Sequence, residues 1–528
     1  MSSHCRFGRA SVALVACAAW LTGCSGGGRG GAAVPQSPSG SGWVAGVFLP
    51  ADGFAARCAA PRSGTDPATG LPYADLQGNV VDENNWLRSW SDDLYLWYDE
   101  IVDRDPGLYT TSGYFDLLRT TATTPSGAPR DKFHFSVPTD EWQALSQSGV
   151  SAGYGVHWTF IASLPPRDAV VAFTEPMSPA ATAGLARGAR LLRIDGVDFI
   201  NDETQTGADT LSAALFPQQA GEMHTFEVMD LGAATAREIV LQSANVTSAP
   251  VPTVATLDTL SGKVGYLLFN DHIATAEQAL VDAVETLDAA GINDLVLDLR
   301  YNGGGFLVIA SQLAYMLAGD VPTAGRVFEE IRFNAKHPST NPVTGVALEP
   351  FPFATTTVGL STSAGEALPT LDLQRVFVLT GPDTCSASES IINSLRGVDV
   401  EIIQIGSTTC GKPYGFFPAD NCGTTYFTIQ FQGVNAQGFG DYPDGFSPLN
   451  ALGAQGVTIP GCAVADDYTQ PLGDPAEARL AAALGYRESQ SCPAPASLGP
   501  PGVSKPSLSA ADGRLLRAPW RENRILEY

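Results

Sequence analysis

A strand, a helix and a second strand follow one another within residues 375–406, and this succession constrains the fold more than any other feature. Residues 375–380 form a short apolar run bounded by a glycine and a proline, which is typical of a buried strand. Residues 387–396 carry apolar side chains at helical spacing, and residues 401–406 form the next apolar run. Such βαβ units are almost always right-handed crossovers between parallel strands, so the sequence predicts an α/β core with a mixed sheet.

Two candidate catalytic residues flank this unit. Ser386 precedes the predicted helix, in the sequence Cys-Ser-Ala-Ser-Glu, and Lys412 lies in the loop after the second strand. Because the carboxyl ends of parallel strands meet at one edge of a sheet, we expect both side chains to face one crevice. A serine beside an unprotonated lysine is a complete nucleophile and general base. Only five of the 30 basic residues are lysines, and a desolvated lysine can lose a proton where arginine cannot.

A third predicted strand leads to the same edge. We expect this strand at residues 294–300, which lead through Tyr301 and Asn302 to three consecutive glycines at 303–305. Glycines let the backbone approach a ligand closely and turn its N–H groups toward an anion. Acyl transfer needs such donors for its oxyanion, and losing one costs roughly 100–1000-fold in rate. We therefore expect an oxyanion site formed by the N–H groups of Gly303, Gly304 and Ala387.

Each of these features also has a simpler explanation. Ser386 with Glu389 fits a helix capping box, a glycine triplet after a strand is commonly a turn, and a lone lysine is commonly a surface charge. Cys385 is a conceivable nucleophile as well, although no histidine motif accompanies it. The convergence of three features on one sheet edge favours a catalytic site.

On these motifs the chain resembles the carboxyl-terminal processing, or tail-specific, proteases, which use a Ser–Lys dyad. The family's nucleophile segment, approximately S-A-S-A-S-E, aligns with residues 384–389 and places the nucleophile at Ser386. The lysine segment, approximately G-E-x-T-F-G-K-G, aligns with residues 406–413, and the N-G-G-G loop aligns with residues 302–305. The resemblance covers roughly residues 146–487. It implies a serine endopeptidase with a ClpP/crotonase-like core that needs no metal or organic cofactor.

The chain departs from this family around the dyad. Phe416 stands where some members have a glutamine that orients the lysine. Cys385 and Cys410 stand where the family usually has alanine and an aromatic residue, which indicates a divergent branch. The third member of the site has three candidates, Glu389, Gln430 and Gln432.

The segment before the core resembles a PDZ domain. In that domain the backbone N–H groups of a short loop hold the carboxylate of a peptide, which adds as a strand beside it. The alternative is a hairpin and helix with no ligand. The resemblance implies that protein or peptide substrates are selected by their free C-termini. The loop that matches consists of Gly153, Tyr154, Gly155 and Val156.

The N-terminus has the layout of a secretory signal, with two arginines before a short apolar run at residues 12–21. Residues 21–24, Leu-Thr-Gly-Cys, resemble a bacterial lipobox, which would make Cys24 the lipidated first residue of the mature chain. A plain signal peptide cut nearby is the alternative. Ser25 is the type of residue that directs such proteins to the outer membrane. We therefore expect attachment by lipid alone at the periplasmic face of the bacterial outer membrane.

Cysteine usage agrees with export. Six cysteines remain beyond Cys24, and an even number in an oxidising compartment predicts three disulfides. We expect Cys462 to pair with Cys492, and Cys410 with either Cys385 or Cys422. No cysteine or histidine spacing typical of a metal site is present in the sequence.

Length and charge set further bounds. A net charge of −25 over 528 residues disfavours nucleic acid and anionic lipid as partners. An aromatic stretch at residues 86–97 predicts a packing helix. The expected organisation is a lipoprotein signal peptide at 1–23, a flexible tether at 24–57, an N-terminal helical region at 58–145, a PDZ domain at 146–246, a peptidase core at 247–487 and a Pro-rich tail at 488–528.

Two other functions fit parts of this pattern. One is a pseudoprotease adaptor, whose PDZ domain and cleft bind protein tails at the cell envelope without cleaving them. The other is a carrier of apolar ligands, which the same fold is known to hold. An intact Ser386, Lys412 and glycine loop favour a peptidase over both. A peptidase of this type needs a neutral lysine, so we expect activity to rise with pH through a lowered lysine pKa.

Overall fold

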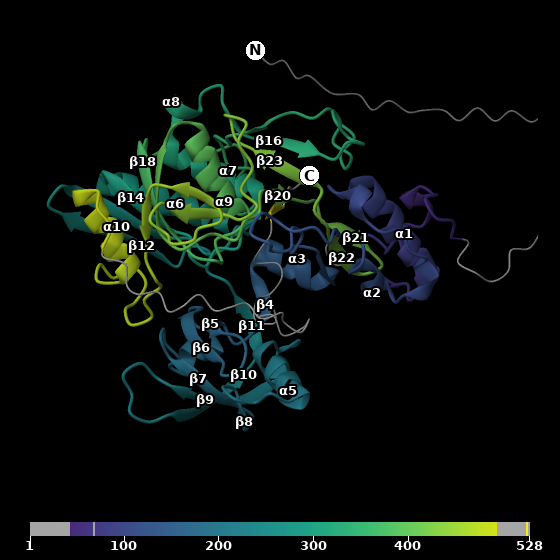
Figure 1. Cartoon of the computed structure of the whole chain (residues 1–528), viewed down its shortest axis with the longest axis horizontal. Coiled ribbons are helices and arrows are strands. Elements are labelled where there is room, and N and C mark those ends of the chain that lie inside the picture. Colours follow the sequence, from purple (N-terminus) through teal and green to yellow (C-terminus); the bar gives the residue numbers. More distant parts are fainter. Residues whose placement is uncertain (1–42, 67–68, 494–523, 526–528) are drawn as a thin grey trace, which may run out of the picture. The chain divides into compact units, whose positions relative to one another are not determined.

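The computed structural model describes residues 43–66, 69–493 and 524–525 (Figure 1). The predicted signal peptide and Cys24 lie outside these residues. Within the described ranges, every helix is too short or too polar to cross a bilayer.

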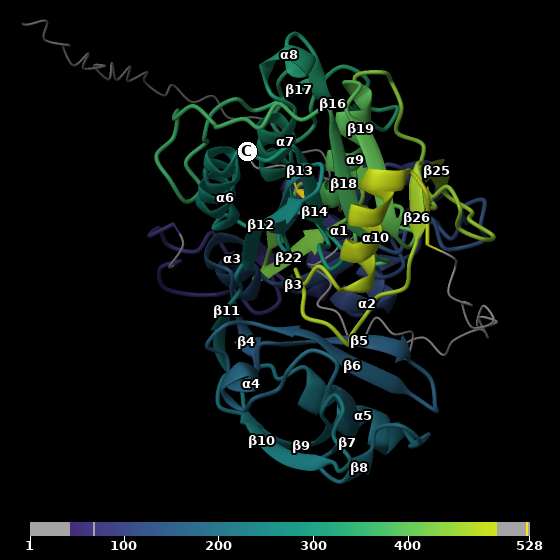
Figure 2. The same ribbon diagram turned by 90° about the vertical axis from the view of Figure 1, so that its left-hand side faces the viewer.

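The central sheet has six strands in the order β12-β13-β14-β18-β19-β26, all of which are labelled in Figure 2. The first pair is antiparallel and all later neighbours are parallel, so the sheet is mixed, as predicted. Parallel pairing brings the carboxyl ends of β14, β18 and β19 to the same edge. The bounds are β12 (Thr253–Thr259), β13 (Gly262–Leu268), β14 (Asp294–Asp298), β18 (Arg375–Thr380), β19 (Glu401–Gly406) and β26 (Gly461–Ala463).

The predicted βαβ unit is confirmed. β18 and β19 have the predicted bounds and pair in parallel, from Arg375 opposite Glu401 to Thr380 opposite Gly406. Between them α9 (Ala387–Gly397) begins directly after Ser386. The turn that contains Ser386 and the loop that contains Lys412 therefore follow adjacent parallel strands.

Helices cover both faces of this sheet (Figure 2). Side chains alternate along a strand, so Val376 and Val378 of β18 join the apolar cluster of α6 (Ala276–Ala290), α7 (Leu307–Ala318) and α9. Phe377 and Leu379 join the opposite cluster, which contains α10 (Ala478–Ser489). Burial on both faces explains why these strands are continuous apolar runs.

The region before the core contains α1 (Val80–Leu94), α2 (Thr111–Phe115) and α3 (Thr139–Ser148). The aromatic stretch packs as predicted: Trp86 and Trp90 of α1 are buried and stacked, with ring centroids 5.2 Å apart.

The described part of the range predicted as a flexible tether, residues 43–57, makes contacts with α1. Arg88 of α1 is buried and donates hydrogen bonds to the carbonyls of Val44 (3.2 Å) and Val47 (2.8 Å). Its guanidinium also pairs with Asp103 at 2.6 Å. A buried guanidinium has five N–H donors to satisfy, and the backbone of this segment supplies acceptors for two of them.

Residues 150–247 form a β-rich unit with its own apolar cluster. Its main sheet has the order β10-β9-β7-β6-β5, and α5 (Gln205–Leu215) packs against it. Two strands at its ends pair with each other and lead to the rest of the chain, β4 (Val150–Gly153) and β11 (Ala244–Thr247). The sheet strands are β5 (Val156–Ala162), β6 (Asp168–Thr174), β7 (Arg190–Ile194), β9 (Met223–Met229) and β10 (Arg237–Gln242).

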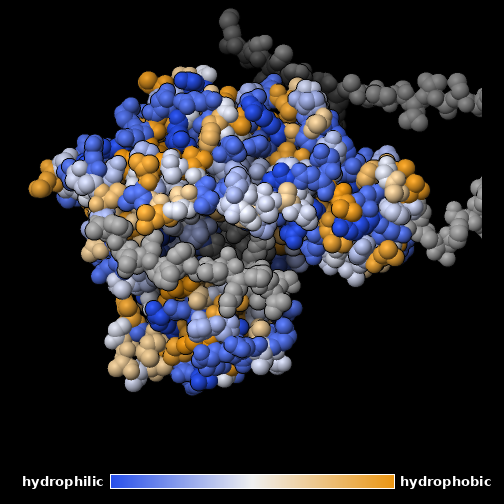
Figure 3. All heavy atoms as spheres, in the orientation of Figure 1, coloured by the Kyte–Doolittle hydropathy of each residue, from blue (hydrophilic) through white to orange (hydrophobic). Residues whose placement is uncertain are grey.

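On the face drawn in Figure 3, hydrophilic and hydrophobic residues are interspersed. Exposed large apolar side chains include Met177, Leu260 and Leu452, which lie on separate loops of the chain. Single exposed apolar side chains of this kind are normal on a protein surface.

Candidate functional site

Three loops that follow core strands meet at one edge of the sheet. The main-chain carbonyl of Asn302, in the glycine loop, accepts hydrogen bonds from the Cys385 N–H (3.1 Å) and from Ser388 Oγ (3.1 Å). In the lysine loop, the Cys410 N–H donates to the Thr384 carbonyl at 3.0 Å. These bonds attach the glycine loop and the lysine loop to the turn that contains Ser386.

Ser386 occupies the N-cap of α9 in a strained backbone conformation. Its φ of 61° and ψ of −117° lie in a region that residues other than glycine rarely adopt. Strain of this kind persists only where surrounding contacts impose it, and a sharp strand-to-helix turn is one way to present a nucleophile. Ser386 Oγ is buried and has no hydrogen-bond partner among the described residues.

Glu389 joins the serine loop to the lysine loop. Its Oε2 accepts the N–H of Ser386 at 3.0 Å and the N–H of Lys412 at 2.8 Å. Its Oε1 accepts the N–H of Gly411 at 2.9 Å and the hydroxyl of Thr409. Burial raises the pKa of this carboxyl, and the four donors oppose that rise. Because all four partners donate, the geometry fits an ionised carboxylate.

The other two candidates for the third residue have different partners. The side chain of Gln430 exchanges two hydrogen bonds of 3.1 Å with the backbone of Phe417. Gln432 donates to the carbonyl of Gly440 at 2.7 Å. Of the three candidates, Glu389 accepts hydrogen bonds from the backbone of both Ser386 and Lys412.

Lys412 is fully buried between aromatic rings. Its Nζ lies 4.4 Å from the centroid of the Phe416 ring and 4.7 Å from that of the Phe133 ring. The apolar setting expected from Phe416 is therefore present. Phe133, from the region before the core, was not anticipated from the sequence, since it lies in no recognisable motif.

A disulfide joins the turn that contains Ser386 directly to the lysine loop. Cys385 and Cys410 are bonded, with their Cα atoms 5.1 Å apart, so the residue before Ser386 is tied to the lysine loop. In this form neither sulfur is a thiolate, the form in which cysteine binds metals. The predicted pair Cys462–Cys492 is confirmed. Of the two partners predicted for Cys410, the structure has Cys385, and Cys422 is bonded to Cys58 instead.

The glycine loop is shaped by Asn302. The Oδ1 atom of Asn302 accepts the Gly304 N–H at 2.9 Å and lies 2.9 Å from His272 Nδ1. Burial lowers the pKa of His272 to about 3, so the ring is neutral and its Nδ1–H is the donor. The Gly304 N–H, expected to bind an oxyanion, is thus engaged within its own loop. Gly303 and Ala387 remain as the expected donors.

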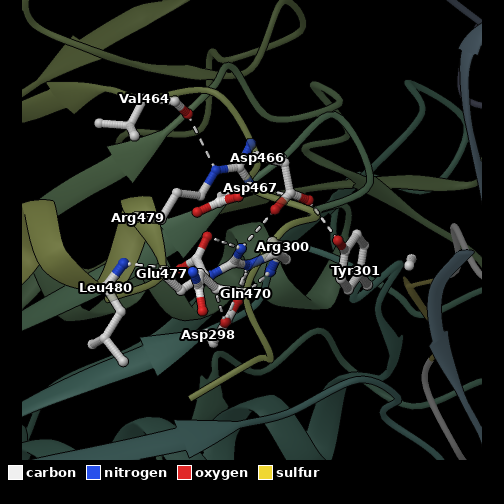
Figure 4. Close-up of polar contacts among 12 residues, drawn as sticks. Asp298, Arg300, Tyr301, Val464, Asp466, Asp467, Gln470, Glu477, Arg479 and Leu480 are labelled. Atoms are coloured by element: carbon white, nitrogen blue, oxygen red, sulfur yellow. Dashed lines mark hydrogen bonds and ion pairs between the residues drawn. The ribbon is translucent and has the colours of Figure 1, made fainter. Parts of the chain in front are cut away.

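Arg300 anchors the chain just before this loop (Figure 4). Its buried guanidinium pairs with Asp298 (3.0 Å), Asp466 (2.7 Å) and Glu477 (2.8 Å). Burial opposes ionisation of Asp466, but the guanidinium groups of Arg479, Arg300 and Arg187 outweigh it and hold its pKa well below the usual range.

The same network reaches the β-rich unit. Arg187 of that unit donates to the Tyr301 hydroxyl at 2.7 Å and pairs with Asp466 at 2.8 Å. Tyr301 also donates to Asp466, as the dashed line in Figure 4 shows. Since Tyr301 precedes Asn302, this contact connects the β-rich unit to the start of the glycine loop.

A cavity of about 1020 Å³ extends from the predicted carboxylate-binding loop to the glycine loop. Its lining includes residues 153–156 as well as Tyr301 and Gly303. The carbonyls of Tyr154 and Gly155 accept N–H groups of Ala180 (2.9 Å) and Glu175 (2.7 Å), which fixes the loop. A Cβ atom on Gly155 would lie 2.3 Å from Ser178 Cβ, so this position requires glycine.

The cavity is acidic. Among the described residues that line it, none is lysine or arginine. His157 is the one histidine among the described lining residues, and its Nε2 lies 2.8 Å from Glu175. Sequence reasoning missed this concentration of charge, because the residues come from distant segments and only the net charge hinted at it. The carboxyl groups belong to Asp140, Glu141, Glu175, Glu222 and Asp383.

Comparisons with known proteins agree with this geometry. The family model "Peptidase family S41" matches residues 263–417, a range that contains the glycine loop, Ser386 and Lys412. A carboxyl-terminal-processing protease of Synechocystis is 29% identical over 137 residues, which cover 26% of this chain and 31% of that protein. The chloroplastic carboxyl-terminal-processing peptidase 2 of Arabidopsis thaliana is 30% identical over 166 residues, 31% of this chain and 30% of that protein.

The chain thus matches about a third of the length of these curated relatives. The crystal structure of a putative S41 protease from Bacteroides fragilis superposes with a TM-score of 0.56 and 23% identity, and the match covers 77% of this chain and 97% of that one. The segment that holds the glycine loop, Ser386 and Lys412 therefore matches peptidase family S41, and the chain has the fold of an S41 protease.

Proposed function

We propose that this chain is a serine endopeptidase in which Ser386 is the nucleophile and Lys412 the general base. The proposal rests mainly on the contacts of Glu389 with the Ser386 turn and the lysine loop. One of its carboxylate oxygens accepts the backbone N–H groups of both Ser386 and Lys412. A helix cap alone would need the first of these bonds and not the second. The similarity to carboxyl-terminal-processing proteases supports peptide bonds as the substrate class.

In the proposed reaction, neutral Lys412 takes the proton of Ser386 Oγ as that oxygen attacks the scissile carbonyl. The N–H groups of Gly303 and Ala387 hold the resulting oxyanion; Ala387 begins α9, where backbone donors lack intrahelical partners. Lys412 returns the proton to the leaving amine, and the acyl group remains on Ser386. Water, deprotonated by the same lysine, then releases the acyl group and restores the serine.

Substrate selection is assigned to the β-rich unit, acting as a PDZ domain. A free C-terminus would bind at residues 153–156, and the body of the peptide would follow the cavity toward Gly303. The substrates would be proteins of the bacterial envelope, reached from a lipid anchor on Cys24 at the periplasmic face of the outer membrane. These last assignments rest on the sequence resemblance alone.

The test compares the parent chain with Lys412→Arg, using an unfolded protein with an apolar C-terminus as substrate. Arginine keeps the positive charge and cannot act as a base. Cleavage by the parent alone, with substrate binding by both, supports the peptidase. Binding without cleavage by both proteins would favour the pseudoprotease adaptor instead. The parent's activity should also rise between about pH 5 and pH 9, because only the neutral amine accepts a proton; a flat profile would contradict the role of Lys412.

A further inference from the structure

The described residues nearest the C-terminus form a strand beside the glycine loop. β27 (Arg524–Ile525) pairs in parallel with β15 (Gly305–Phe306), with Arg524 opposite Gly305 and Ile525 opposite Phe306. β15 begins at the last residue of the glycine triplet. β27 also contacts β20 (Tyr414–Gly415), which closely follows Lys412. The strand therefore contacts both the segment after the glycine loop and the segment after the lysine.

The two edges of β15 differ in what they can accept. One edge is closed by the core, because Gly305 bridges to His272 and the Phe306 N–H donates to the His272 carbonyl at 2.8 Å. A Cβ atom on Gly305 would lie 2.3 Å from that carbonyl oxygen. The other edge carries β27. Main-chain pairing is independent of sequence, so this edge can also accept an extended peptide from another molecule, and any preference among peptides must come from other contacts such as charge.

Charge distinguishes the C-terminal segment from the rest of the chain. Residues 514–528 contain four arginines and two glutamates, whereas the whole chain has a net charge of −25. The cavity that reaches Gly303 is lined by five carboxyl-bearing residues and, within the described part of the chain, by no lysine or arginine. Opposite charge draws a basic segment toward this cavity and disfavours acidic ones.

We propose that the outer edge of β15 is the docking site for an extended basic peptide strand, and that this chain's own C-terminal segment at Arg524–Ile525 is its resident ligand. The inference rests on the proposed function, because it makes this edge the place where a substrate strand lies. In the same parallel register, a longer peptide would continue past Gly305 toward Gly303, where the expected oxyanion donors lie. Substrate and C-terminal segment then compete for one edge.

The test uses the full chain carrying Ser386→Ala, so that binding is measured without cleavage. In one variant, Arg524→Pro with Ile525→Pro removes both backbone N–H groups of β27, which prevents strand pairing. The matched control, Arg524→Ala with Ile525→Ala, makes the same loss of side chains and keeps both N–H groups. A fluorescein-labelled synthetic peptide of residues 514–528 is titrated into each protein, and fluorescence anisotropy gives Kd.

We expect the proline variant to bind the peptide at least about ten-fold more tightly than the alanine control, because a tethered competitor acts at a millimolar effective concentration. A peptide with its four arginines changed to glutamate should bind neither variant at comparable concentrations. Equal Kd values for the proline and alanine variants would overturn the proposal, as would tight binding of the glutamate peptide.

A failure of the docked C-terminal strand can be distinguished from a failure of the proposed peptidase activity. The binding experiment gives its result whether or not the parent cleaves peptides. With Ser386 restored, the proline variant should show a lower KM for an external peptide than the alanine control, with the same kcat. If the parent cleaves peptides and the proline variant has the same KM as the alanine control, the proposed peptidase activity is supported and the docked C-terminal strand is refuted.

Discussion

Oε2 of Glu389 accepts the backbone N–H groups of Ser386 at 3.0 Å and of Lys412 at 2.8 Å, so a single buried oxygen sets the spacing of the two loops. The disulfide between Cys385 and Cys410 spans the same two loops beside it. The proposed nucleophile and base are thus held together twice, once by a carboxylate and once by a covalent bond.

Glu389→Gln should lower kcat roughly 10–100-fold with little change in KM, because an amide NH₂ would face backbone N–H groups and leave buried donors unsatisfied at about 1–3 kcal/mol. Steady-state kinetics on a peptide substrate measures both constants. Glu330→Gln is the matched control, since Glu330 is half-exposed and pairs with Arg332 on the surface. A Glu389→Gln enzyme with the parent's kcat would show that the carboxylate does not position the site.

Removal of the Cys385–Cys410 disulfide should mainly lower activity, whereas removal of the Cys58–Cys422 disulfide should mainly lower stability. Replacing Cys385 and Cys410 by serine releases the two catalytic loops, and we expect kcat to fall about ten-fold or more, because small misplacements of reacting groups are costly. Replacing Cys58 and Cys422 opens a much longer loop, with a sequence separation of 364 residues against 25. That variant should lose more thermal stability, on the order of 3–5 kcal/mol, and keep its kcat. Equal kcat in the two variants would contradict the role given to Cys385–Cys410.

Gly305→Ala should abolish activity and destabilise the fold by roughly 1–3 kcal/mol. Gly305 has a φ of +142°, and an added Cβ would lie 2.3 Å from the His272 carbonyl oxygen. Gly325→Ala is the control: its φ is +68°, but nothing lies within 4 Å of the added atom, so only the backbone cost of about 1 kcal/mol applies. Urea unfolding and peptidase assays on both variants test the difference. Full activity of Gly305→Ala would mean that the glycine loop need not have this shape.

His272 makes stability depend on pH in a defined direction. Burial lowers its pKa to about 3 in the folded chain, while an exposed histidine has its ordinary pKa of 6.5. Below about pH 6.5, His272 binds a proton in the unfolded chain but stays neutral in the folded chain. The free energy of unfolding therefore falls as the pH drops toward 3.

His272→Asn removes this titration and keeps an amide donor for Asn302 Oδ1. Between about pH 7 and pH 4, the parent should lose on the order of 3 kcal/mol more stability than the variant. Chemical unfolding at the two pH values measures this. A stability difference between parent and variant that stays constant with pH would show that His272 does not titrate in this way.

The central βαβ unit could be predicted because its two strands are buried on both faces. Val376 to Leu379 alternate between two apolar clusters, so the strand is a continuous apolar run bounded by turn residues. Ser386 follows the first strand and Lys412 the second, so their place at one edge of the sheet followed from the parallel pairing of the two strands. The pairing of Cys462 with Cys492 could also be predicted, because only 30 residues separate the two cysteines.

Other parts of the site depend on contacts between distant segments. Phe133, from the region before the core, contacts Lys412. Cys58 forms a disulfide with Cys422, which lies 364 residues later in the sequence. The engagement of the Gly304 N–H by Asn302 is a matter of loop geometry that no motif encodes. Arg88 donates to the carbonyls of Val44 and Val47, which lie far from it in sequence and within the range predicted as a flexible tether.

The account depends most on Ser386 as the nucleophile, and Ser388 two residues later provides the matched comparison. Ser388 Oγ donates to the Asn302 carbonyl at 3.1 Å, so its removal loosens one loop contact without removing the attacking oxygen. The decisive measurement is the rate at which parent, Ser386→Ala and Ser388→Ala cleave an unfolded protein with an apolar C-terminus. We predict that Ser386→Ala loses at least about 10⁴-fold in kcat, while Ser388→Ala stays within about ten-fold of the parent. Retention of the parent's rate by Ser386→Ala would contradict the account.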